Sequence, residues 1–121
     1  MKALRVLLME DDTLIGLLLA EMLEEMGHEV CAVEATETAA VAAALRCRPQ
    51  LLIVDVRLRD GSGVSAVDRI LRTGPVPYIL MSGDISRVRA LRPGSVVLQK
   101  PFREPDFVRA IQRALNAPAV A

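Results

Sequence analysis

Short apolar runs alternate with helix-like segments along this chain, and no other feature of the sequence constrains the fold as strongly. Five runs have the length of strands and lie at residues 4–9, 29–33, 51–54, 77–81 and 95–98. Segments with helical periodicity follow them, near residues 14–26, 36–46, 64–71, 84–91 and 105–115. Strands that alternate with helices in this way form parallel sheets covered on both faces. We therefore expect an α/β fold with a doubly wound, five-stranded parallel sheet and helices on both faces.

Residues with particular backbone preferences mark the ends of the helical segments. Asp12 or Thr13 can cap the first helix, and Gly27 suits its C-terminal end. Pro105 fits the first turn of the last helix. We expect residues 117–121 to form a loose tail after that helix.

The length of 121 residues fits one domain, so we expect residues 1–121 to form a single unit without an output domain. No apolar stretch approaches the roughly twenty residues of a membrane span, and the N-terminus lacks a signal-peptide cleavage pattern. Fifteen basic and fifteen acidic residues give a net charge of zero, which provides no general attraction to nucleic acid. These features predict a cytoplasmic protein that contacts neither membrane nor nucleic acid directly.

Two cysteines and one histidine give no sign of a metal or redox site. Cys31 and Cys47 are expected to be small reduced residues of the core, because a chain of this size folds without disulfides. His28 follows the glycine at the end of the first helix, and we expect it to be an exposed turn residue.

Polar residues stand where four of the predicted strands end. Glu10, Asp11 and Asp12 follow the first strand and Asp55 follows the third, while Ser82 and Lys100 follow the fourth and fifth. In doubly wound sheets, ligands bind beside the carboxyl ends of the strands. Capping acids and a surface lysine would explain any one of these positions, but they explain all four poorly. We therefore expect these side chains to converge at one site.

The residue types at this site favour phosphoryl transfer to a carboxylate. Clustered carboxylates repel one another and need a cation, and a set of oxygen ligands favours Mg²⁺ over zinc. Asp55 can act as a nucleophile and form an acyl phosphate, while Ser82 and Lys100 can bind the transferred oxygens.

At this point the sequence resembles a known family, the receiver domains of bacterial two-component response regulators. The resemblance covers nearly the whole chain and rests on four motifs in order, at residues 6–12, at residues 51–55 with Gly63, at residues 79–83 and at residues 100–102. It implies a flavodoxin-like strand order of 2-1-3-4-5.

The resemblance also assigns roles to the residues of the site. It implies that Asp55 is the phosphoacceptor and that Asp11 binds Mg²⁺ directly, while Glu10 binds it through water. Asp55 and the backbone carbonyl of Arg57 complete the implied ligands. Asp12, the third acid, is expected to be a helix cap.

Two further residues and the partners follow from the same resemblance. Ser82 takes the place of the family's hydroxyl residue and Lys100 that of its phosphate-pairing lysine, with a cis bond before Pro101. The implied phosphodonor is a sensor histidine kinase or a histidine phosphotransfer protein. The downstream protein target is unknown, and the domain is expected to be a signalling module rather than an enzyme with an external substrate.

The sequence departs from the family pattern near the output surface. Arg59 replaces a common proline, and Val97 stands where an aromatic residue usually reorients on activation. The fourth helix is expected to be short, and phosphorylation either orders this segment or leaves it rigid. We also expect Arg57 and Asp84 to form an ion pair across the mouth of the pocket.

Three other classes of protein share parts of this pattern. A haloacid-dehalogenase-type phosphatase needs a second aspartate two residues after its nucleophile, where this chain has Arg57. A flavodoxin-like FMN binder needs a phosphate loop after the first strand, and the three acids there would repel a phosphate. A pseudo-receiver would have lost the acceptor chemistry, although the required residues are present. The chain is either a stand-alone receiver or a fragment of a larger regulator.

Overall fold

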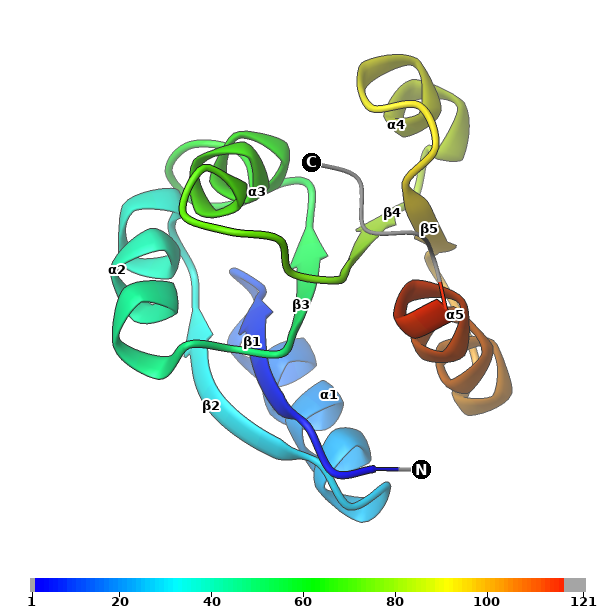
Figure 1. Cartoon of the computed structure of the whole chain (residues 1–121). Helices are drawn as coiled ribbons and strands as arrows, with labels where there is room; N and C mark the ends of the chain where they lie inside the picture. Colours follow the sequence, from blue (N-terminus) through cyan, green and yellow to red (C-terminus); the bar gives the residue numbers. More distant parts are fainter. Residues whose placement is uncertain (1, 117–121) are drawn as a thin grey trace.

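A parallel sheet of five strands forms the middle layer of the computed structural model, which describes residues 2–116 (Figure 1). The strands are β1 (Arg5–Met9), β2 (Glu29–Glu34), β3 (Leu51–Asp55), β4 (Tyr78–Ser82) and β5 (Val96–Gln99). The helices are α1 (Thr13–Glu25), α2 (Glu37–Cys47), α3 (Gly63–Leu71), α4 (Ile85–Leu91) and α5 (Glu104–Asn116). The strand order β2-β1-β3-β4-β5 confirms the predicted fold. The tail expected at residues 117–121 lies outside the described residues.

The sheet separates two hydrophobic cores. On one face, side chains such as Val6 and Ile53 pack with Leu23 of α1 and Phe107 of α5. On the other face, alternate strand residues pack with helices α2, α3 and α4. Every residue of β3 is buried, since this strand lies in the middle of the sheet and is covered on both sides. The unbroken apolar sequence of β3 therefore reflects its central position.

Side-chain caps fix the starts of helices α1, α3 and α4, which follow strands β1, β3 and β4. The Asp12 carboxylate accepts hydrogen bonds from the backbone N–H groups of Leu14 at 3.0 Å and Ile15 at 3.1 Å. Asp12 is therefore the cap of α1, as the resemblance implied. Ser62 caps α3 in the same way, and Asp84 caps α4.

Helix α4 is short, as the sequence predicts, and its C-terminal end is held by Arg92. The Arg92 Nε donates to the Tyr78 hydroxyl at 2.7 Å, and its guanidinium also pairs with Asp68 of α3. The Tyr78 hydroxyl lies 2.8 Å from the Ser95 hydroxyl. These contacts connect α4 to α3 and to the amino end of β4.

The prediction that His28 is exposed is wrong. Only 4% of its surface is exposed, and its Nδ1 accepts a hydrogen bond from the Leu4 N–H at 3.1 Å. The chain turns back sharply after α1, where the His28 N–H bonds the Leu23 carbonyl, so the ring lies beneath the start of β1. This turn residue is buried because the turn packs against the amino ends of the strands.

The cysteines are free, as predicted, but they are only half-buried and do not lie deep in the core. Strand β2 is an edge strand, so Cys31 is covered on fewer sides than a residue of β3. The Cys47 thiol donates to the Cys31 carbonyl at 3.5 Å. Within residues 2–116, no helix is long and apolar enough to cross a membrane.

Candidate functional site

The polar residues at the strand ends meet at the carboxyl edge of the sheet. Glu10 directly follows β1, Asp55 and Ser82 are the last residues of β3 and β4, and Lys100 directly follows β5. Glu10, Asp55 and Ser82 are at most 7% exposed. Charged residues are rarely buried in proteins, so their convergence at the carboxyl ends of the strands marks this end of the sheet as a candidate functional site.

The ammonium group of Lys100 lies between two of the carboxylates. Its Nζ is 3.1 Å from Glu10 Oε1 and also bonds Asp55 Oδ2. Burial alone would lower the pKa of Lys100, but the hydrogen bonds and charges of Asp55 and Glu10 outweigh burial and raise that pKa above its ordinary value. Lys100 is therefore charged throughout the physiological pH range and holds the two acids together.

Glu10, Asp11 and Asp55 form a cluster that fits a divalent cation. One carboxylate oxygen from each lies within 4.8 Å of the others. Burial raises the pKa of Glu10, and the charge of Asp55 raises it further, although the Asp12 N–H opposes this by donating to Glu10 Oε2 at 3.2 Å. A cation would favour the ionised form of Glu10. The donors are oxygen atoms only, as Mg²⁺ prefers.

The backbone around Asp55 is fixed by the loop that follows it. Asp55 Oδ1 accepts a hydrogen bond from the Arg57 N–H at 3.0 Å. A Cβ on Gly63 would lie 2.2 Å from the Asp55 carbonyl oxygen, a distance that no side chain tolerates. Glycine at this position therefore lets the start of α3 approach the acceptor strand closely. This explains the spacing between Asp55 and Gly63 in the sequence.

Ser82 and Lys100 are also connected through the backbone. The Lys100 N–H donates to the Ser82 carbonyl at 2.9 Å, and the bond between Lys100 and Pro101 is cis, as the resemblance implied. The Ser82 hydroxyl accepts a bond from the Asp84 N–H at 3.0 Å. The hydroxyl and the ammonium group thus lie at the ends of neighbouring strands.

The expected ion pair between Arg57 and Asp84 is wrong for the structure described over residues 2–116. Instead, the Asp84 carboxylate accepts a hydrogen bond from the Arg87 N–H at 3.1 Å and caps α4. A capping carboxylate is held against its own helix, which keeps Asp84 from reaching across the pocket.

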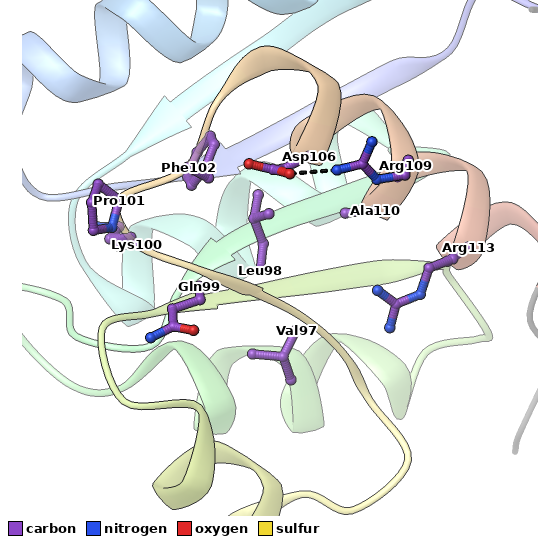
Figure 2. Close-up of a pocket in the computed structure, with 10 residues that line it drawn as sticks. All are labelled: Val97, Leu98, Gln99, Lys100, Pro101, Phe102, Asp106, Arg109, Ala110 and Arg113. Atoms are coloured by element: carbon purple, nitrogen blue, oxygen red, sulfur yellow. Dashed lines mark hydrogen bonds and ion pairs between the residues drawn. The ribbon is translucent and has the colours of Figure 1, made fainter.

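A separate cavity of about 460 Å³ lies between β5 and α5 (Figure 2). Val97, Phe102 and Arg113 help to line it, and Lys100 is its one residue in common with the acidic site. The carboxylates of Glu10, Asp11 and Asp55 are not among its lining residues.

Glu37 is a residue of this region that the sequence did not single out. Its carboxylate bonds Ser62 and Ser65, which lie 25 and 28 residues further along the chain, next to the loop after Asp55. A glutamate in the first turn of a helix is too common to predict such contacts. Only the packing of α2 against α3 brings these groups together.

The comparison with known proteins agrees with the fold. Residues 6–112 match the model of the response regulator receiver domain family. The phyllosphere-induced regulator PhyR of Methylorubrum extorquens is 36% identical over 93% of this chain and 44% of its own length. The transcriptional regulatory protein PdtaR of Mycobacterium tuberculosis is 34% identical over 93% of this chain and 57% of its own length.

The similarity extends to solved structures. The receiver (REC) domain of the PhyR response regulator of Erythrobacter litoralis superposes with a TM-score of 0.88 at 31% identity, over 98% of this chain and 97% of that domain. This chain belongs to the response regulator receiver domain family. It spans about half the length of the two curated relatives, PhyR and PdtaR.

Proposed function

We propose that residues 1–121 act as one receiver module that accepts a phosphoryl group on Asp55 in a Mg²⁺-dependent reaction. The observation that carries this proposal is the position of Asp55. Its buried carboxylate ends the central strand, bonds Lys100 and lies within 4.8 Å of Glu10 and Asp11. A nucleophile, a cationic side chain and the ligands for a metal therefore lie next to one another.

The metal ligands in this proposal are Glu10, Asp11, Asp55 and the backbone carbonyl of Arg57. When bound, Mg²⁺ supplies positive charge next to the transferred oxygens and relieves the repulsion among the acids. Asp11 would bind the ion directly, and Glu10 through water. Both Glu10 and Asp55 already face the Lys100 ammonium group, so the site is organised around positive charge.

The acceptor reaction uses groups that the structure holds in place. A carboxylate oxygen of Asp55 attacks the phosphorus of a phosphohistidine, the N–P bond breaks and the imidazole leaves. Lys100 neutralises charge that develops on the phosphoryl oxygens, and the Ser82 hydroxyl donates to one of them. Because the Ser82 hydroxyl now donates to the Asp84 carbonyl at 3.3 Å, this exchange would alter the start of α4.

The phosphodonor in this proposal is a sensor histidine kinase or a histidine phosphotransfer protein, in the cytoplasm. Receiver domains as a family are signalling domains that interact with such kinases and with effectors. The two curated relatives are a phyllosphere-induced regulator and a transcriptional regulatory protein. Their names differ in output, so we assign this chain no particular downstream target.

Phosphatase activity on small esters is less well supported. Two residues after Asp55 stands Arg57, whose side chain cannot act as the second acid of such an enzyme. The observed contact of Arg57 is a backbone N–H bond to Asp55, which supports an acceptor loop rather than a proton donor.

The experiment is phosphorylation by a small donor. The protein is incubated with acetyl phosphate in Mg²⁺ or in EDTA, and its intact mass is measured. We expect a phosphate mass increment that requires Mg²⁺ and that is absent from Asp55→Asn. An increment of equal size in EDTA would contradict the metal dependence, and no increment under any condition would contradict the acceptor function.

A further inference from the structure

The side chain of Glu37 connects helix α2 to the start of α3. Glu37 Oε1 accepts a hydrogen bond from the Ser62 N–H at 2.9 Å. Its other oxygen, Oε2, accepts from the Ser65 hydroxyl at 2.7 Å and from the Arg69 guanidinium at 3.1 Å. The carboxylate is 14% exposed, so water competes little for these bonds. Three donors from one neighbouring element thus converge on a single carboxylate.

The backbone reinforces this connection. The Glu37 N–H donates to the Asp60 carbonyl at 2.9 Å, and the Arg59 N–H donates to the Ala35 carbonyl at 3.1 Å. The hydroxyl of Ser65 and the N–H of Ser62 hold the pKa of Glu37 below its ordinary value, so the carboxylate is ionised at neutral pH. Bonds to an ionised acceptor are stronger than bonds between neutral groups.

The segment that Glu37 holds is the loop between the acceptor strand and α3. Within this loop, Arg57 and Ser62 form an antiparallel bridge, and the Gly63 N–H donates to the Val56 carbonyl at 3.1 Å. The position of Ser62 therefore sets the position of Arg57. Arg57 in turn donates its N–H to Asp55 Oδ1. Two hydrogen bonds, joined by the backbone pairing of Ser62 with Arg57, thus connect Glu37 to the acceptor carboxylate.

We propose that Glu37 is a positioning residue for the metal site, which fixes Ser62 and, through it, the Arg57 carbonyl and the Asp55 carboxylate. This inference rests on the proposed function, because the groups that Glu37 would position are the metal ligands proposed there. Without the Glu37 contacts, the loop would have to become ordered when the metal binds. The entropic cost of that ordering would weaken the affinity for Mg²⁺. Groups that orient metal ligands typically change affinity about 10–100-fold when they are lost.

Gly61 gives an independent way to disturb the same contact. Its φ angle is +84°, and a Cβ at this position would lie 2.5 Å from both Cβ and Oε1 of Glu37. An alanine at residue 61 must therefore displace the Glu37 side chain or shift the loop. Gly61→Ala disturbs the contact from the loop, whereas Glu37→Ala removes it from the helix.

The first experiment measures Mg²⁺ binding by calorimetry in Glu37→Ala and Glu37→Gln. We expect Glu37→Ala to bind Mg²⁺ about 10-fold more weakly, at the lower end of the range for such groups. Glu37→Gln should lose less, because an amide oxygen can still accept from the Ser62 N–H. The matched control is Glu29→Ala, which removes an exposed glutamate of β2 and should bind Mg²⁺ as the wild type does.

Amide exchange and thermal melting separate positioning from a general loss of stability. We expect Glu37→Ala to exchange faster at residues 57–62 while the strands stay protected. A folded Glu37→Ala protein with wild-type Mg²⁺ affinity would overturn the inference. Failure of the proposed function would look different, because the wild type itself would then bind no Mg²⁺ or accept no phosphoryl group.

The double variant provides a second test that does not depend on Glu37→Ala alone. If Gly61→Ala acts by displacing Glu37, the double variant should bind Mg²⁺ no more weakly than the weaker single variant. Independent, multiplicative losses would show that the two substitutions act on different contacts and would overturn the inference. Should Glu37→Ala not fold, Gly61→Ala and Glu37→Gln still decide the question by their Mg²⁺ affinities.

Discussion

The two ends of the sheet both bury polar side chains, but they use them differently. At the carboxyl end, Glu10 and Asp55 both bond Lys100, and one oxygen of each lies within 4.8 Å of the other and of Asp11. At the amino end, His28 accepts a hydrogen bond from the N–H of Leu4, just before β1, and Gln50 accepts one from the N–H of Arg5, the first residue of β1. One end therefore concentrates charge, whereas the other completes the hydrogen bonds of the strands.

This difference separates residues that serve binding from residues that serve the fold. A group that completes a backbone hydrogen bond stabilises the native state. A cluster of carboxylates costs stability, and a bound cation offsets that cost. Substitutions at the carboxyl end should therefore change metal and phosphate binding, while those at the amino end should change stability alone.

The largest expected effect is at the carboxyl end, between two neighbouring acids. Asp11→Ala should weaken Mg²⁺ binding at least about 100-fold, because Asp11 belongs to the carboxylate cluster. Asp12→Ala should leave Mg²⁺ affinity nearly unchanged and reduce stability by about 1 kcal/mol, because Asp12 caps α1. Calorimetric titration and thermal melting of both variants test this, and equal losses of Mg²⁺ affinity would break the comparison.

The next effect concerns Lys100. In EDTA, Lys100→Ala should lose about 2 kcal/mol of stability, because it leaves the Glu10 and Asp55 carboxylates without their cationic partner. This loss is smaller than the loss expected for a fully buried ion pair, because Lys100 is partly exposed to water. Added Mg²⁺ should stabilise this variant more than it stabilises the wild type, since it then supplies all the positive charge. Urea unfolding with and without Mg²⁺ measures both effects. A variant as stable as the wild type in EDTA would show that the acids do not need Lys100.

At the amino end, His28 should make stability depend on pH. Burial lowers the pKa of His28 below its ordinary value of 6.5, so the unfolded chain binds the proton more tightly than the native state. Stability is therefore complete above pH 6.5 and is lost as the pH falls towards the lowered pKa. His28→Gln keeps an acceptor for the Leu4 N–H without this titration. At pH 7.5 it should be within about 1–2 kcal/mol of the wild type.

Urea unfolding between pH 7.5 and 5.5 provides the test for His28. The wild type should lose more stability over this range than His28→Gln does, with Mg²⁺ affinity unaffected in the variant at pH 7.5. Parallel curves for the two proteins would mean that His28 does not titrate in this way.

The smallest effect is expected for the pair of Arg92 and Asp68. The Asp68 side chain is 45% exposed, so Asp68→Asn should cost only about 0.5 kcal/mol, and less in high salt. Amide exchange at the end of α4 should become faster while the acidic site is unchanged. A free-energy change of about 0.5 kcal/mol corresponds to about a twofold change in rate. A change in phosphorylation rate of about tenfold or more would therefore show that the amino end also controls the chemistry.

The site at the carboxyl end of the sheet could be predicted from the sequence, because its residues lie at or just after the ends of apolar runs. Asp55 directly ends an apolar run, and the parallel topology brings such ends together. His28, Glu37 and Arg92 carry no such signal. Their partners lie 14 to 32 residues away in the sequence, so their roles depend on how turns and helices pack. The exposure of His28 was wrong for this reason, as was the pairing of Asp84, which caps its own helix.

The central claim is that Asp55 receives the phosphoryl group at the charged end of the sheet. Its most direct test is peptide mapping by mass spectrometry after the wild-type protein reacts with acetyl phosphate in Mg²⁺. We predict that the label lies on Asp55, with none on Asp11 or Asp12. A label on either of those residues, or undiminished labelling of Asp55→Asn, would contradict the account.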